Sequence, residues 1–165
     1  MPEFWMDADS LIRPYREAYR FNIVPKFWEF LEEKAEEQVI ASSGLVLQEL
    51  EENSNKEEPD ELLIWAKRQQ GVLFLPPTDS VQEVFAQIAE NVKNNEKYAA
   101  HWVQKFLDGA DPWIIAHAKA LGGRVVTFEK PEPNSRKVKI PDVAAEFGVK
   151  CICLWDMLTE LKAQF

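Results

Sequence analysis

The stretch DPWIIAHAKALGGRVVTFE (residues 111–129) decides the fold class, because it encodes a helix, a stop and a strand without a break. Asp111-Pro112 is a typical helix start, with an acid that can cap the helix and a proline at its first position. Gly122-Gly123 ends the helix, and the run 124–128 is rich in the β-branched and aromatic residues of a strand. A helix that leads directly into a buried strand is typical of an α/β fold.

The same alternation of strands and helices extends to both ends of the chain. Strands are predicted at 4–6, 39–41, 72–75, 124–128 and 151–154. Helices are predicted at 25–38, from Ser42 or Ser43 to Glu52, at 60–70, from 79 to 106 in two pieces, at 111–121, at 141–147 and after 154. Polar, proline-bearing loops are predicted at 53–60 and 130–137. This order predicts an α/β fold with a central, mostly parallel sheet between layers of helices.

Length and composition favour one folded domain over residues 1–165. Of the 165 residues 46% are hydrophobic, which excludes wholesale disorder. No apolar run approaches the ~18–20 residues of a membrane span, and the N-terminus lacks the basic start of a secretory signal. Cys151 and Cys153 stand two apart in a predicted strand, where their side chains point to opposite faces, so no disulfide is expected. These features predict a cytoplasmic protein.

Charge is spread unevenly along a chain whose net charge is −9. The segment 29–61 has twelve acids and two bases, whereas 112–141 has six bases and two acids, and 13–26 has four bases and one acid. The net charge argues against indiscriminate coating of nucleic acid, but a basic segment can still hold a polyanion locally. A solvated face explains the basic segments equally well.

Several carboxylates are predicted to meet at one edge of the sheet, because parallel sheets collect functional residues at the carboxyl ends of their strands. Asp7 and Asp9 follow the first predicted strand, and Glu129 follows the fourth. Asp111 begins a helix at the same edge. Glu49 falls inside the apolar arc of its helix, and its side chain leans toward the helix N-terminus and therefore toward that edge.

Four or five carboxylates at close range repel one another unless a cation lies among them. A ligand set of oxygens without His or Cys suits Mg²⁺ or Mn²⁺, which usually bind substrate phosphate. Each acid also has a structural explanation: an N-cap for Asp111, an acidic helix for Glu49, a loop for Glu129 and a turn for Asp7 and Asp9. The residues alone leave both interpretations open.

Four segments, taken together, resemble the landmarks of a PIN-like domain. They are MDADSLI (6–12), SSGLVLQEL (42–50), the stretch 111–129 and IPDVAAEFGV (140–149). They are most similar to a bacterial branch of PIN-like proteins with the patterns ADPW-IAHA and VKIPDV. The resemblance implies a three-layer α/β/α sandwich and a Mg²⁺- or Mn²⁺-dependent endoribonuclease that hydrolyses RNA phosphodiesters. Such proteins are often the toxin of a toxin–antitoxin pair, so the resemblance also implies an antitoxin partner and a homodimer.

By this resemblance the catalytic and metal-binding acids are Asp7, Glu49, Asp111 and Glu129. Asp7 and Asp111 would bind the metal directly, while the two glutamates would complete the site or orient water. Asp9, where the family often has Asn or Ser, and Thr127 would support the metal through hydrogen bonds. The fourth acid is Glu where the family commonly has Asp. The alternative is a PIN-like interaction module with weak or no nuclease activity.

Basic and aromatic residues near this edge are candidates for RNA contact. Lys137 and Lys139 alternate in a strand-like run beside the predicted site, and Arg13 begins a basic segment. Trp113, close to the third acid, can stack on a base, although a core position is the usual place of a tryptophan. His117 is predicted to be a packed helix residue, and the sequence contains no zinc motif.

Overall fold

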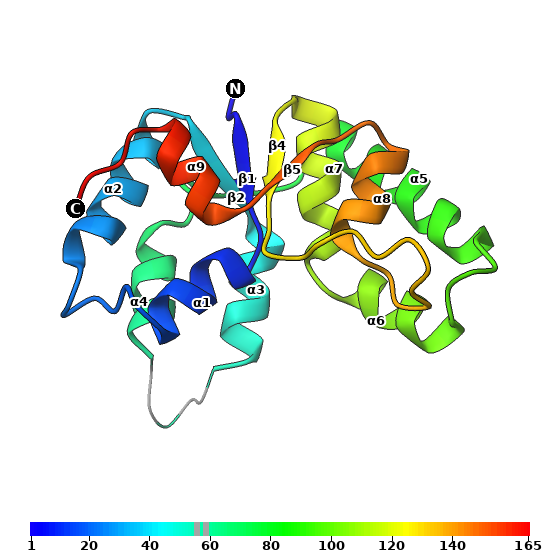
Figure 1. Cartoon of the computed structure of the whole chain (residues 1–165), viewed down its shortest axis with the longest axis horizontal. Coiled ribbons are helices and arrows are strands. Elements are labelled where there is room, and N and C mark those ends of the chain that lie inside the picture. The colour runs from blue at the N-terminus through cyan, green and yellow to red at the C-terminus, as the bar shows by residue number, and fades with distance from the viewer. Residues whose placement is uncertain (55–56, 58–59) are drawn as a thin grey trace.

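Five short parallel strands form the centre of the computed structural model, which describes residues 1–54, 57 and 60–165. Within this part of the chain their order is β3-β2-β1-β4-β5, so that β1 lies in the middle (Figure 1). Trp5 of β1 pairs with Ala41 of β2 and Val125 of β4. Every residue of β1 and β2 is buried, as expected for parallel strands covered on both faces. The strands are β1 (Phe4–Met6), β2 (Ile40–Ser43), β3 (Phe74–Leu75), β4 (Arg124–Val126) and β5 (Cys151–Ile152).

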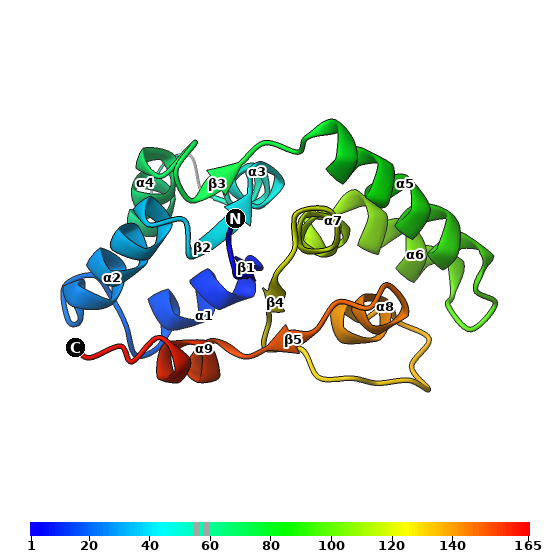
Figure 2. The same ribbon diagram turned by 90° about the horizontal axis from the view of Figure 1, so that it is seen from above.

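Helices cover both faces of the sheet, which confirms the predicted α/β fold with three layers. One side carries α1, α2, α4 and α9, and the other carries α5, α6, α7 and α8, while α3 packs beside β3 (Figures 1 and 2). The bounds are α1 (Asp9–Arg16), α2 (Pro25–Glu36), α3 (Gly44–Glu52), α4 (Glu61–Arg68), α5 (Asp79–Asn94), α6 (Ala100–Asp108), α7 (Asp111–Leu121), α8 (Ile140–Glu146) and α9 (Leu154–Glu160).

Helix α7 forms as the sequence predicts, and the strand after it, β4, ends at Val126, two residues before the predicted end. The helix packs against β1, β2 and β4 and is covered in turn by α5. It ends at Gly122 and Gly123, whose φ angles are +84° and +117°. A Cβ on Gly123 would lie 2.9 Å from the carbonyl oxygen of Pro2, so only glycine allows the chain to turn this close to β1. The turn places Asp111 and the end of β4 at the same edge of the sheet.

Several details differ from the prediction. The N-cap of α7 is Ala110, and no side chain caps this helix, so the prediction of a capping role for Asp111 is wrong. β5 ends at Ile152, because Cys153 is already the N-cap of α9. Both cysteines are free, as predicted. The segment with Lys137 is irregular rather than strand-like, since its backbone pairs with no strand of the described residues.

One helix was not predicted, namely α1, which is two turns long and contains Pro14. A side chain before the helix stabilises its first turn, because Asp7 Oδ1 accepts a hydrogen bond from the Ser10 N–H at 2.9 Å. The predicted loop at 130–137 is confirmed, whereas residues 55, 56, 58 and 59 of the predicted loop at 53–60 lie outside the described residues. Among the residues described, no helix has both the length and the apolar character needed to cross a membrane.

Candidate active site

Asp7 lies at the carboxyl end of β1 and is almost fully buried, with 3% of its surface exposed. Its carboxylate accepts hydrogen bonds from the Ser10 N–H and from the Thr127 hydroxyl. Its own N–H donates to the carbonyl oxygen of Val126 at 3.0 Å, which ties it to the end of β4. Burial raises the pKa of Asp7 to about 6, although the hydrogen bonds oppose this rise.

Asp111 is the first residue of α7 and is only partly buried. Burial is the largest cause that raises its pKa to about 8, and the negative charges of Asp7, Glu129, Glu49 and Asp9 follow in that order. In the described part of the chain its carboxylate has neither a hydrogen-bond donor nor a cation as partner. Asp111 is therefore surrounded by other acids, and because no cation of the described chain stabilises its charged form, it keeps its proton up to a pH of about 8.

Glu49 and Glu129 reach the same place from distant parts of the chain. The carboxylate of Glu49, on α3, accepts a hydrogen bond from the N–H of Ala110, just before α7, and partial burial raises its pKa. Oε2 of Glu129 accepts a hydrogen bond from the Ile140 N–H at the start of α8, at 2.7 Å. Each glutamate thus joins two elements at the carboxyl edge of the sheet.

A pocket of about 300 Å³ contains three of the four acids, Glu49, Asp111 and Glu129. Asp7 does not line this pocket, but its charge raises the pKa of Asp111. The other wall of the pocket is basic and aromatic, and it comes from α6 and the segment before α8. Its charged and aromatic members are Trp102, Lys105, Phe106, Lys137 and Lys139.

The donor chemistry of this site suits a divalent cation. The four acids offer only oxygen ligands and leave an excess of negative charge, which is what Mg²⁺ or Mn²⁺ prefers. As the side chains stand, no group of three or more His, Cys, Asp or Glu among the described residues is close enough to hold an ion. Three of the four carboxylates, those of Asp7, Glu49 and Glu129, are turned toward backbone N–H groups. The charge and donor set fit a metal, whereas a closed ligand shell is not formed.

The predicted supporting residues lie at the same edge but differ in their partners. The Thr127 hydroxyl donates a hydrogen bond to the Asp7 carboxylate and accepts one from the N–H of Glu129 at 3.1 Å, so it links two of the acids. Asp9 instead pairs with Arg13 at 2.9 Å across one turn of α1. The Arg13 guanidinium lies over the Phe128 ring, 4.2 Å from its centroid, so both its charge and its flat face are occupied.

The predicted RNA contacts separate into two groups. Lys137 and Lys139 line the pocket, whereas Trp113 stacks on Phe85 with ring centroids 3.9 Å apart and borders a smaller pocket. Trp102 and Lys105 line the pocket with the acids, although the sequence did not predict them as site residues. Their spacing of three on one helix places them on the same face, but nothing in the sequence predicts which pocket that face borders.

His117 is a buried core residue, as predicted. Its ring stacks on Trp5 with centroids 4.7 Å apart, and Nε2 lies 3.1 Å from the Ser43 hydroxyl. Burial lowers its pKa to about 4, so the ring is neutral at physiological pH. It lines none of the pockets that contain the acids.

Comparisons with known proteins extend over nearly the whole chain. The family described as "Domain of unknown function (DUF4411)" matches residues 4–165. The crystal structure of FitAcB from Neisseria gonorrhoeae is similar in fold, with a TM-score of 0.53 and 18% identity, covering 92% of this chain and 98% of that chain. At this identity the likeness concerns the fold alone. No curated protein matches the sequence.

Proposed function

The chain belongs to the DUF4411 family, and we propose that it is a metal-dependent endoribonuclease that hydrolyses RNA phosphodiesters. Two observations support this proposal: the resemblance of four sequence segments to PIN-like domains, and a three-layer fold similar to that of FitAcB. An RNA substrate also agrees with the cytoplasmic location that the sequence predicts. By the same resemblance we propose that the protein is a toxin held by an antitoxin and that it forms a homodimer.

A single observation carries the proposal, namely the cluster of acids around Asp111, which no cation of the described chain compensates. The Asp111 pKa of about 8 arises from burial and from four neighbouring acids. A protein that gained nothing from this cluster would lose stability by keeping it, because buried like charges repel. A divalent cation would remove the repulsion and would turn the cluster into a site for phosphate.

In this proposal Asp7 and Asp111 bind the metal directly, and Glu49 and Glu129 complete the site or orient water. The metal, when bound, would neutralise phosphate charge, activate water and stabilise the leaving oxygen. The protein's own contacts would fix the acids: Thr127 and the Ser10 N–H hold Asp7, and the Ile140 N–H holds Glu129. Such partners orient the carboxylates before substrate arrives.

The alternative function, a PIN-like interaction module with little or no nuclease activity, also has an observation in its favour. Among the described residues the acids do not form a group that could hold a metal as they stand. In a binding module the acidic edge would serve a basic segment of a partner protein. The two functions differ in their response to metal, and this difference decides between them.

The test is the cleavage of a fluorogenic single-stranded RNA by the purified protein with EDTA, Mg²⁺ or Mn²⁺. We expect cleavage only with metal, and a rise in melting temperature with Mn²⁺, because a ligand that binds the native state stabilises it. Asp111→Asn should abolish both effects. The matched control is Asp156→Asn, an exposed acid in the first turn of α9, which should keep both. A wild-type protein that neither cleaves RNA nor responds to Mn²⁺ would favour the interaction module.

A further inference from the structure

The basic wall of the pocket is built around one indole ring. Trp102 on α6 has the Nζ atoms of two lysines near its ring, Lys137 at 4.6 Å and Lys105 at 5.3 Å from the centroid. The wall is held together by the backbone, since the N–H of Ala99, before α6, donates to the carbonyl oxygen of Arg136 at 3.1 Å. Two segments more than thirty residues apart in the sequence therefore present one aromatic ring and two cations together.

The cations of this wall are free of acids. In the described part of the chain, no Asp or Glu oxygen lies within 4.0 Å of the Nζ of Lys105, Lys137 or Lys139. All three nevertheless line the same pocket as Glu49, Asp111 and Glu129. The pocket therefore has an acidic side suited to a metal and a basic side suited to phosphate, with a flat aromatic ring on the basic side.

We infer that Trp102 stacks on a nucleobase next to the scissile phosphate, while Lys105 and Lys137 bind the adjoining phosphate oxygens. This inference rests on the proposed function and names the residues that position its substrate. A base can replace the lysines over the indole, because an exposed cation–π contact is weaker than base–indole stacking. The displaced ammonium groups then face the phosphates on either side of the stacked base, and the exchange loses no ionic contact.

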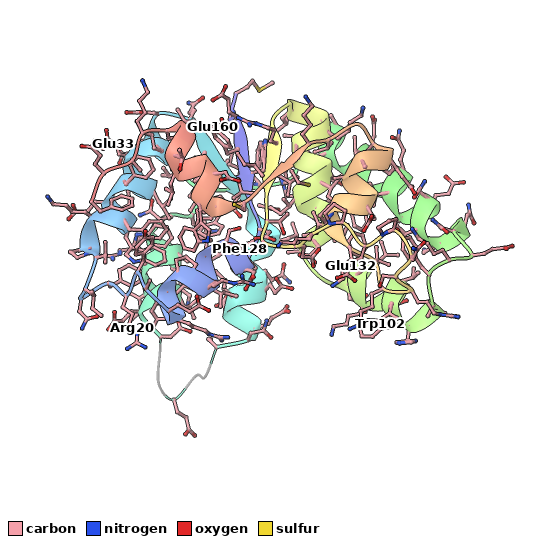
Figure 3. The ribbon with its side chains drawn as sticks, in the orientation of Figure 1. Arg20, Glu33, Trp102, Phe128, Glu132 and Glu160 are labelled. Carbon is pink, nitrogen blue, oxygen red and sulfur yellow. The ribbon has the colours of Figure 1, made fainter. Side chains whose placement is uncertain are left out.

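Trp102 is the ring suited to this role among the tryptophans near the pocket. One face of Trp113 is covered by Phe85, with ring planes 5° apart, so it is already stacked. Trp155 packs edge-on against Tyr19 and lies against Phe128, outside the pocket. Figure 3 shows Trp102 on the half of the molecule formed by α5 to α8, where the basic wall lies.

The test is a double-mutant cycle between the protein and the RNA. Affinity of a short single-stranded RNA is measured in EDTA, so that no cleavage occurs, for the wild type and for Trp102→Leu, which keeps an apolar side chain but removes the ring. Each variant is measured with the intact RNA and with a series of RNAs that carry one abasic position. We expect Trp102→Leu to weaken binding of the intact RNA by roughly 5- to 150-fold, the range for loss of one base–aromatic stack.

The effects on RNA affinity of removing the base and of removing the Trp102 ring should not be additive. At one position next to the cleaved bond, loss of the base should weaken wild-type binding by a similar factor and leave binding by Trp102→Leu unchanged. Trp155→Ala is the control and should show no such coupling. Equal losses from the abasic position in wild type and Trp102→Leu would overturn the inference, as would unchanged affinity in Trp102→Leu.

The outcomes also separate the inference from the proposed function. RNA binding that depends on Trp102 in a protein that cleaves no RNA under any metal would refute the proposed function, and of the inference it would support the stacking of a base on Trp102 while overturning its place beside a cleaved bond. Metal-dependent cleavage with the same KM in wild type and Trp102→Leu would refute the inference alone. Circular dichroism of each variant shows whether it is folded, and Trp102→Phe, which restores an aromatic face, should recover part of the affinity.

Discussion

Two regions near the acids, on the α6 side and on the α1 side of the molecule, each combine a cation with an aromatic ring, but they differ in whether the cation has an acidic partner. On the α6 side, Trp102 has lysines over its ring, and these lysines have no acidic partner in the described chain. On the α1 side, Arg13 is paired with Asp9 at 2.9 Å and also covers the ring of Phe128 at 4.2 Å. Figure 3 places Phe128 between the two halves of the molecule. A cation and an aromatic ring near a site are thus insufficient to make a binding surface, because they must also be free.

The α1 side is in fact a packed aromatic surface. Trp155 lies 5.4 Å from Phe128 and 5.7 Å from Tyr19, measured between ring centroids, and Tyr19 in turn contacts Phe165. These contacts stabilise the ends of α1 and α9 against each other. The sequence predicted an RNA contact for both Arg13 and Lys137, but only Lys137 is without an acidic partner in the described chain.

The largest effect should come from the acids, which serve both sides. Asp111→Asn removes a proposed metal ligand, so we expect cleavage to fall by about 100-fold or more, beyond any variant of either wall. In metal-free buffer the same change should raise the melting temperature, because the fold then no longer has to keep protonated a carboxyl that ionises in the unfolded chain. Cleavage rates and thermal melts of Asp111→Asn and Asp156→Asn measure both effects. Wild-type cleavage by Asp111→Asn would remove this residue from the site.

The pH dependence of the metal-free protein should follow the same acids. Asp7 and Asp111 have folded-state pKa values of about 6 and about 8, above the usual 3.8. At a pH between 3.8 and these folded-state pKa values, the folded state binds more protons than the unfolded state. The free energy of unfolding therefore falls as pH rises from about 4 to about 8. Urea denaturation in EDTA across this range measures the slope. Asp111→Asn should flatten its upper part, and a flat wild-type profile would contradict the assignment.

Removal of cations from the two sides should affect RNA binding unequally. Lys105→Ala with Lys137→Ala removes two phosphate contacts, so the slope of log K against log salt should decrease by about 1.4, or 0.7 for each contact on a single strand. Arg13→Ala should leave the slope nearly unchanged, because this cation is already paired. RNA affinity in EDTA at several salt concentrations gives the slopes. Equal changes in both variants would erase the distinction between the two sides.

The smallest effect should come from releasing Arg13. Asp9→Asn breaks an exposed ion pair across one helical turn, so we expect it to cost only about 0.3–0.5 kcal/mol of stability. The freed guanidinium should tighten RNA binding slightly and steepen its salt dependence. If Asp9 instead supports the metal, the affinity for Mn²⁺ should fall while RNA binding in EDTA stays the same. Titrations with RNA and with Mn²⁺ separate these outcomes.

Much of the fold follows from local pattern. The Asp-Pro start, the Gly-Gly stop and the β-branched run of 111–129 predict α7 and β4, and the structure contains both. Helix α1 could not be predicted in this way, because it is short and contains Pro14, and because its first turn depends on the position of Asp7 after β1. Local propensity is a weak guide where one buried side chain stabilises an element.

The candidate site, like the fold, was predicted from the sequence only in part. The sequence by itself determined that acids stand at the carboxyl ends of parallel strands and at a helix start, since chain direction fixes where those ends lie. Only the tertiary structure decided which acids have partners: Asp7, Glu49 and Glu129 receive hydrogen bonds, and Asp111 receives none from the residues that the structure describes. It also decided that Trp102 and Lys105 join Lys137 beside the acids, while Arg13 is neutralised by Asp9. The reason is that charge compensation acts over a few ångströms in space, and residues distant in the chain become neighbours only when the layers pack.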